Sequence, residues 1–114
     1  MISKALVAAS TKPLILGILK GGENYGYQII QRVKELSGGS IEWADGMLYP
    51  VLHRLEKEGL VSTKWKISDE NRMRKYYRLT EAGRKELEVE IEQWISVNAV
   101  LSKIWEPLPA FEQA

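Results

Sequence analysis

Residues 61–80 read VSTKWKISDENRMRKYYRLT, and this stretch decides the fold. Up to residue 67, apolar or aromatic side chains alternate with polar or charged ones, which is the period of a half-buried strand. Residues 68–71 are polar and predict a turn, and a second alternating segment follows over residues 73–79. The stretch therefore predicts a two-stranded hairpin with a polar tip. One face of the first strand carries Val61, Thr63, Trp65 and Ile67, and one face of the second carries Met73, Lys75, Tyr77 and Leu79.

Helices are predicted on the N-terminal side of this hairpin. A short apolar helix is expected over residues 2–9, and a buried helix follows from about Pro13 to the glycines at 21 and 22. Asn24 is expected to cap an amphipathic helix that ends at residues 38 and 39. Residues 41–43 are a short strand candidate. Asp45 is then expected to cap a helix that reaches Gly59 and turns Leu48, Leu52 and Leu55 inward.

A long helix is predicted after the hairpin, capped by Thr80 and reaching about Trp105. Helices followed by a basic hairpin are the layout of a winged helix-turn-helix, so the fold class is mainly α with a small β-hairpin and added terminal helices. Four parts are expected. Residues 1–10 form a helix that packs on a partner subunit, 11–79 the winged helix-turn-helix, 80–106 a dimerisation helix and 107–114 a disordered tail.

The composition of the 114 residues excludes several classes of function. The chain has no cysteine and a single histidine, His53, which excludes disulfides, cysteine-rich zinc sites and a thiol nucleophile. We therefore expect no enzyme activity, no cofactor and no metal. The N-terminus lacks the features of a signal peptide, and no apolar run approaches the length that spans a bilayer. These observations predict a cytoplasmic protein that does not enter membranes.

The net charge of +1 hides an asymmetry along the chain. Residues 1–80 carry 13 basic and 8 acidic side chains, a balance of +5, whereas residues 81–114 carry 3 and 7, a balance of −4. A basic front part suits an anionic partner such as double-stranded DNA. Two ordinarily solvated surfaces would give the same numbers.

The helix after residue 45 is the candidate recognition helix. Its leading turn carries no lysine or arginine, so strong bidentate reading of guanine is not available there, and readout would rest on Met47, Tyr49 and DNA shape. Gly46 would let a phosphate or base approach the backbone closely, or would merely relax the entry turn. The DNA-contacting residues expected on this helix are Gly46, Met47, Tyr49, His53 and Arg54.

The hairpin carries the densest positive charge, +4 within residues 62–78. Such a wing would contact phosphates, although charged strands also prevent edge-to-edge aggregation. Tyr76 shares a face with arginines and would offer its hydroxyl to a phosphate, whereas Tyr77 is expected in the core. The wing residues predicted to contact DNA are Lys64, Lys66, Arg72, Arg74, Lys75 and Tyr76.

The last helix carries apolar residues at alternating spacings of three and four, which is a coiled-coil seam and predicts a homodimer. Asn98 lies inside the seam, where it would fix the register or face a cavity. The N-terminal segment with Leu6 and Ala9 would cover the partner's long helix. The dimerisation residues are Leu87, Ile91, Trp94, Leu101 and Trp105.

Several motifs together resemble the PadR family. They are Tyr25-Gly26-Tyr27, Leu48-Tyr49-Pro50 continuing to Arg54-Leu55-Glu56, Glu58-Gly59-Leu60-Val61, Trp65, and Arg74-Lys75-Tyr76-Tyr77-Arg78-Leu79-Thr80 with Gly83. The likeness covers about residues 10–95. The family's usual histidine before the Gly-Tyr pair is absent here, so only the pair Gly26-Tyr27 is carried over. Tyr25 and Tyr27 are expected to contact DNA.

The short N-terminal helix and the single C-terminal helix bearing Trp94 further resemble the small subgroup that includes a lactococcal multidrug-binding repressor. That resemblance implies a dimeric transcriptional repressor that releases its operator when a ligand binds or conditions change. The predicted two-fold dimer would bind a palindromic operator. The resemblance also implies that Trp94 and its symmetry mate sandwich planar aromatic or cationic compounds. Helical spacing adds Leu6, Ala9, Val97 and Asn98 as walls of that ligand site, and a plain dimer core is the competing interpretation. A winged helix that docks only to proteins is the alternative function.

Overall fold

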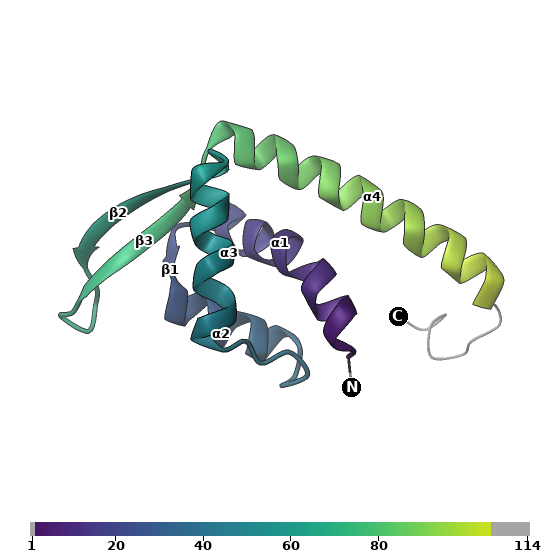
Figure 1. Cartoon of the computed structure of the whole chain (residues 1–114), viewed down its shortest axis with the longest axis horizontal. Helices are drawn as coiled ribbons and strands as arrows, with labels where there is room; N and C mark the ends of the chain where they lie inside the picture. Colours follow the sequence, from purple (N-terminus) through teal and green to yellow (C-terminus); the bar gives the residue numbers. More distant parts are fainter. Residues whose placement is uncertain (1, 106–114) are drawn as a thin grey trace.

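The computed structural model describes residues 2–105 and has four helices and a three-stranded antiparallel sheet within them. The elements are α1 (Lys4–Lys20), β1 (Asn24–Tyr25), α2 (Gly26–Leu36), α3 (Asp45–Lys57), β2 (Val61–Ile67), β3 (Met73–Leu79) and α4 (Glu81–Trp105). The strand order is β1-β3-β2, so the predicted hairpin is confirmed and a two-residue strand joins its free edge. The hairpin extends to one side of the helices, and α4 runs away to the other (Figure 1).

Helix α1 corrects the prediction of two N-terminal helices, because it continues without a break through the expected boundary at residues 10 and 11. Pro13 lies inside it and cannot donate a hydrogen bond to the preceding turn. Ser3 caps the helix, with its Oγ accepting from the backbone N–H of Leu6 (3.2 Å). The residues after the proline are buried in the core, and this packing compensates for the missing bond. They are Ile15, Leu16 and Leu19.

The expected caps of the next two helices are also wrong by one residue or more. Tyr25 occupies the N-cap of α2 and Ala44 that of α3, and neither makes a side-chain cap hydrogen bond. Asn24 instead pairs with β3, and Asp45 is the first residue of its helix. Residues 41–43 form no strand, and the third strand of the sheet is β1. The glycine stops are confirmed, because Gly38 and Gly59 take positive φ angles of 60° and 77°.

The hairpin is in the register that the alternation predicts, with Val61 opposite Leu79 and Ile67 opposite Met73. Its inner half is buried, but its outer half extends beyond the core, so Trp65 remains 64% exposed and Ile67 62%. The face that carries Trp65 and Ile67 is therefore buried only near the core. At the tip Asn71 takes a φ of 61°, the conformation that a glycine usually supplies.

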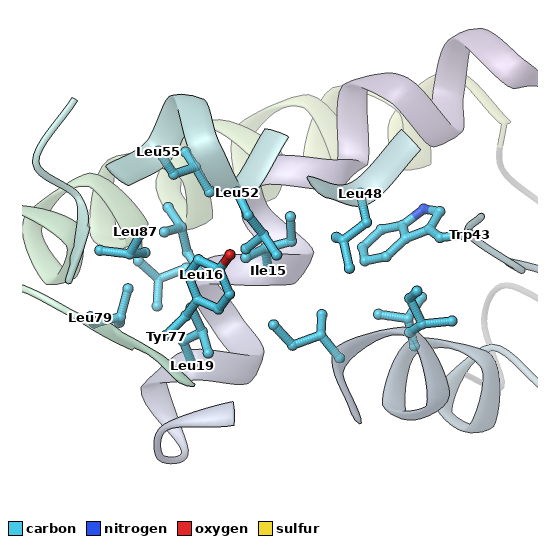
Figure 2. Packing of buried hydrophobic residues seen from close by; sticks show 14 residues of the cluster. Ile15, Leu16, Leu19, Trp43, Leu48, Leu52, Leu55, Tyr77, Leu79 and Leu87 are labelled. Atoms are coloured by element: carbon cyan, nitrogen blue, oxygen red, sulfur yellow. The ribbon is translucent and has the colours of Figure 1, made fainter. Parts of the chain in front are cut away.

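The core lies where α1, α2, α3 and the inner half of the hairpin meet the start of α4 (Figure 2). Thr80 caps α4 as predicted, since its Oγ1 accepts from the backbone N–H of Gly83 (3.0 Å). Leu87 is the last residue of α4 in the core cluster, and residues 91–100 are all exposed. The residues of the predicted tail, 107–114, lie outside the described part of the chain. The α4 helix thus leaves the core after about two turns.

Candidate nucleic-acid interface

The exposed strip of α3 faces away from its buried leucines. Leu48, Leu52 and Leu55 anchor the helix in the core, which leaves the opposite side to solvent. The strip consists of Gly46, Pro50, His53, Arg54 and Lys57. Lys57 was not among the predicted residues, although its spacing from His53 places it on the same face.

Met47 corrects the prediction for the leading turn of α3. It packs against the core and lines a groove of about 750 Å³ between α1 and α3, together with Val51 and one side of Arg54. Its thioether is therefore turned toward α1 and away from the exposed strip. A Cβ at Gly46 would meet no atom of the chain within 4 Å, so packing does not require glycine there.

Tyr49 connects the recognition helix to the start of α2. A Cβ on Gly26 would collide with the Tyr49 ring, so the glycine is what admits this tyrosine. Burial and then the charge of Asp45 raise the pKa of the Tyr49 hydroxyl, which keeps it protonated as a donor. Tyr49 and Tyr27 both remain about half exposed, so another molecule can reach them.

The solvent-facing side of the sheet is a layered arrangement of aromatic rings and cations. The rings of Tyr25 and Tyr76 meet edge to face, with centroids 5.3 Å apart. The Lys66 ammonium lies 4.4 Å from the Tyr76 centroid, and the Arg74 guanidinium lies 4.7 Å from that of Tyr25. Tyr25 is only 5% exposed, and its hydroxyl donates to Glu70 Oε1 (3.0 Å).

Acidic residues pair with half of the wing's cations. Lys66 pairs with Glu23 (2.8 Å), Lys75 with Glu56 (3.4 Å) and Arg74 with Glu70 (3.8 Å). The hydrogen bond with Lys66 lowers the pKa of Glu23, so this carboxylate stays ionised beside the sheet. Among residues 2–105, Lys64, Arg72 and Arg78 form no ion pair. These three cations are the ones directly available to an anion.

Two of these acids could not be found by counting charges along the hairpin. Glu23 belongs to the segment before β1, and Glu56 belongs to α3, where its Oε2 also accepts from Thr63 Oγ1 (2.9 Å). Both reach the wing only through tertiary contacts. Glu70 is in the hairpin turn, but its link to the Tyr25 hydroxyl crosses 45 residues of sequence. Sequence reasoning therefore overestimated the free positive charge of the wing.

The residues predicted for the dimer and ligand sites lie on the far part of α4 and the start of α1. Leu87 is a correction, because at 4% exposure it belongs to the core of its own chain. Ile91 and Trp94 are exposed, as is Trp105, while Leu101 is half-buried. The proposed ligand walls Leu6, Ala9, Val97 and Asn98 are exposed in the single chain. Lys12 holds α1 to α4 through ion pairs with Glu86 and Glu90, and the bond to Glu86 raises the pKa of its ammonium.

In the described part of the chain, no three histidine or carboxylate side chains gather as metal ligands. None of the helices within residues 2–105 is both long and apolar enough to cross a bilayer.

Comparison with known proteins agrees with this architecture. The model of the transcriptional regulator PadR-like family matches residues 15–89. The negative transcriptional regulator PadR of Bacillus subtilis is 36% identical over 76 residues, which are 67% of this chain and 42% of that protein, so the chain spans less than half of its length.

Solved structures extend the likeness over nearly the whole chain. A transcriptional regulator from Clostridium thermocellum has a TM-score of 0.83 at 26% identity and covers 93% of this chain and 100% of its own. A PadR-like transcriptional regulator from Bacillus cereus has a TM-score of 0.81 at 26% identity, with 92% and 100% covered.

The matched span contains the helix-turn-helix, the wing and the start of α4. The finer resemblance to a multidrug-binding subgroup stays a prediction. Because the family model matches most of the length of this chain, the chain belongs to the PadR-like family of transcriptional regulators.

Proposed function

We propose that this chain is a homodimeric repressor that binds palindromic operator DNA through α3 and the wing. The observation that carries the proposal is the position of the free cations Lys64, Arg72 and Arg78 on the hairpin, whose strand β2 packs against α3. Cations of this kind bind phosphates and supply sequence-independent affinity. The exposed strip of α3 would then enter the major groove.

In this arrangement the leading turn of α3 contributes little to the recognition of DNA bases. Met47 faces α1, so Tyr49, His53 and Arg54 are the exposed side chains of α3 that remain for contact with base edges. We expect specificity to depend in part on DNA shape, with half-sites set about 34 Å apart by the dimer.

The DNA proposal is tested by fluorescence anisotropy with a duplex from upstream of the protein's own gene and with a scrambled duplex. Replacing both Arg72 and Arg78 with alanine should weaken binding to both duplexes and reduce the slope of log K against log salt by about 2. The matched control replaces Arg84 and Lys103 of α4. Affinity that the wing substitutions leave unchanged contradicts the wing assignment, and absence of binding to any duplex favours a protein-docking module.

A homodimer is supported by the apolar surface of α4. Besides the predicted seam, Val97, Val100 and Ile104 are more than half exposed, so apolar side chains extend well beyond one seam. An apolar surface of this extent on a single projecting helix is expected to be covered. A second copy of the same helix is the occupant that the seam spacing predicts.

The ligand part of the proposal places a planar aromatic or cationic compound between Trp94 and its symmetry mate. The support is the exposure of the Trp94 ring in the single chain beside Val97 and Asn98. Such compounds should quench tryptophan fluorescence in the parent protein and in Trp65→Phe, but not in Trp94→Ala while sedimentation still reports a dimer. No quenching by any compound of this class would leave Trp94 as a residue of the dimer core.

A further inference from the structure

We propose that the cleft between the β2–β3 turn and the start of α2 binds one backbone phosphate of DNA, and that the carboxylate of Glu70 occupies this site when DNA is absent. The inference rests on the proposed function and deepens it. Its subject is a single subsite of the interface and the residue that competes for it.

The cleft is small and polar. It has a volume of about 250 Å³ and is lined by residues of the hairpin turn and of the first turn of α2. Ser68, Tyr25 and Tyr27 are among its lining residues. A space of this size accepts a tetrahedral anion but no large organic ligand.

One buried donor that lines the cleft, and a second on a residue that contacts Glu70, have no hydrogen-bond partner in the described part of the chain. Ser68 is only 7% exposed, and its Oγ makes no hydrogen bond, although the residue lines the cleft. The Nε of Arg74 is likewise buried and unpaired. Buried polar groups are almost always satisfied, so an unsatisfied hydroxyl lining the cleft and an unsatisfied nitrogen on the arginine that Glu70 contacts indicate an absent acceptor.

Within the described residues around the turn, Glu70 is the one side chain that takes part of the acceptor's place. One carboxylate oxygen of Glu70 accepts from the Tyr25 hydroxyl (3.0 Å) and lies 3.8 Å from a terminal nitrogen of Arg74. A phosphodiester presents two non-bridging oxygens, which share one negative charge, to the same kinds of donor. The donors that hold Glu70 are therefore suited to hold a phosphate.

The donors are fixed while the carboxylate is free to leave. The Tyr25 ring is buried beneath Arg74, and burial followed by the bond to Glu70 raises the pKa of its hydroxyl, so it keeps its proton. The turn is pinned by the bond from Ser68 N–H to the Arg72 carbonyl (2.8 Å). The side chain of Glu70, by contrast, is 61% exposed and can rotate into solvent.

The neighbours of the cleft agree with a DNA-facing position. Tyr27 and Tyr76, both predicted from the sequence to contact DNA, line it. In the complex, Glu70 would turn outward and the phosphate would take up the Tyr25 and Arg74 donors together with the unused Ser68 hydroxyl. Binding thus exchanges one anion for another at the same donors, and Glu70 weakens the affinity for every DNA sequence.

The test compares Glu70→Gln with Asp69→Asn, which removes the same charge from the adjacent position of the turn. Duplex binding is followed by anisotropy over a series of salt concentrations, with circular dichroism to verify the fold. Glu70→Gln should tighten binding by about tenfold, the effect of freeing charge-assisted hydrogen bonds, whereas Asp69→Asn should change it by about twofold at most. The salt slope of Glu70→Gln should also become steeper, because Arg74 then meets the phosphate without an internal counterion.

A second pair of variants identifies the donors. Adding Tyr25→Phe or Ser68→Ala to Glu70→Gln should remove most of the gain, whereas Ser68→Ala in the parent should have a smaller effect. Equal gains from Glu70→Gln and Asp69→Asn would overturn the site, since general charge repulsion then explains both. Weaker binding by Glu70→Gln would overturn it as well, because Glu70 would then act only to brace the wing. Failure of the parent protein to bind any duplex would instead remove the proposed function, and the site with it.

Discussion

At the scale of single residues, two glycines inside helices have opposite surroundings. Gly83 in α4 lies against the backbone of Leu60, and a Cβ there would overlap the Leu60 carbonyl oxygen and touch Leu79. Gly46 in α3 faces open space. Because both glycines lie inside helices, helix propensity alone assigns them the same energetic cost.

We therefore predict that Gly83→Ala lowers the free energy of unfolding by about 3 kcal/mol, because the backbone of Leu60 has to move. Gly46→Ala is the matched control and should raise stability by about 0.5–1 kcal/mol through its better helix propensity. Thermal and urea unfolding measure both. A tolerated Gly83→Ala would show that α4 does not approach the hairpin root as closely as described.

At the scale of elements, Glu56 joins the recognition helix to the wing. Its carboxylate accepts from Thr63 on β2 and pairs with Lys75 on β3. The Thr63 hydrogen bond, followed by the charge of Lys75, lowers the pKa of Glu56 below the ordinary 4.5. The angle between α3 and the wing is thus held by an ionised group.

The sign of the pH effect follows from that direction. A carboxyl whose pKa is lower in the folded state stabilises the fold above its ordinary pKa, and the stabilisation is lost as the pH falls through the folded value. Glu56→Gln should therefore cost about 1 kcal/mol at pH 7, a modest figure because the side chain is a third exposed. The difference from the parent should vanish as the pH falls below 4.5.

Unfolding midpoints measured between pH 3 and pH 7 check this prediction. Glu88→Gln is the control, since Glu88 is exposed on α4 and forms no ion pair with a residue of the described range. A loss of stability that is the same at every pH would contradict the role given to the charge of Glu56.

At the scale of the whole molecule, α4 divides between two roles within one turn. Leu87 is 4% exposed and packs in the core, whereas Ile91, four residues later, is 41% exposed. The helix is roughly 37 Å long at 1.5 Å per residue, so more than half of it extends beyond the core. This part of α4 is the surface that the proposed dimer would bury.

Alanine substitutions at these two positions should separate the roles. Leu87→Ala should lower the free energy of unfolding by about 2–4 kcal/mol at every protein concentration, because it leaves a cavity in the core. Ile91→Ala should weaken dimerisation by about tenfold or more, since the two-fold axis repeats the loss, while dilute protein keeps its fold. Sedimentation velocity and unfolding at several concentrations distinguish the two effects. A dimer constant that Ile91→Ala does not change would place the interface elsewhere.

The features that the sequence determined by itself are those that depend on neighbours along the chain. Alternation set the register of β2 and β3, the leucines of α3 set its inward face, and Gly38 and Gly59 ended helices because only local backbone conformation was needed. The wing and the helix-turn-helix were predictable for the same reason.

The tertiary structure alone decided what depends on segments far apart in sequence. Packing of residues after Pro13 carried α1 through the expected break, and pairing with β3 turned residues 24 and 25 into a strand. The pairs of Lys66 with Glu23 and Lys75 with Glu56, and the bond from Tyr25 to Glu70, reduced the wing's free charge and formed the cleft. Periodicity carries no information about which distant side chains meet, because that depends on how whole elements pack against one another.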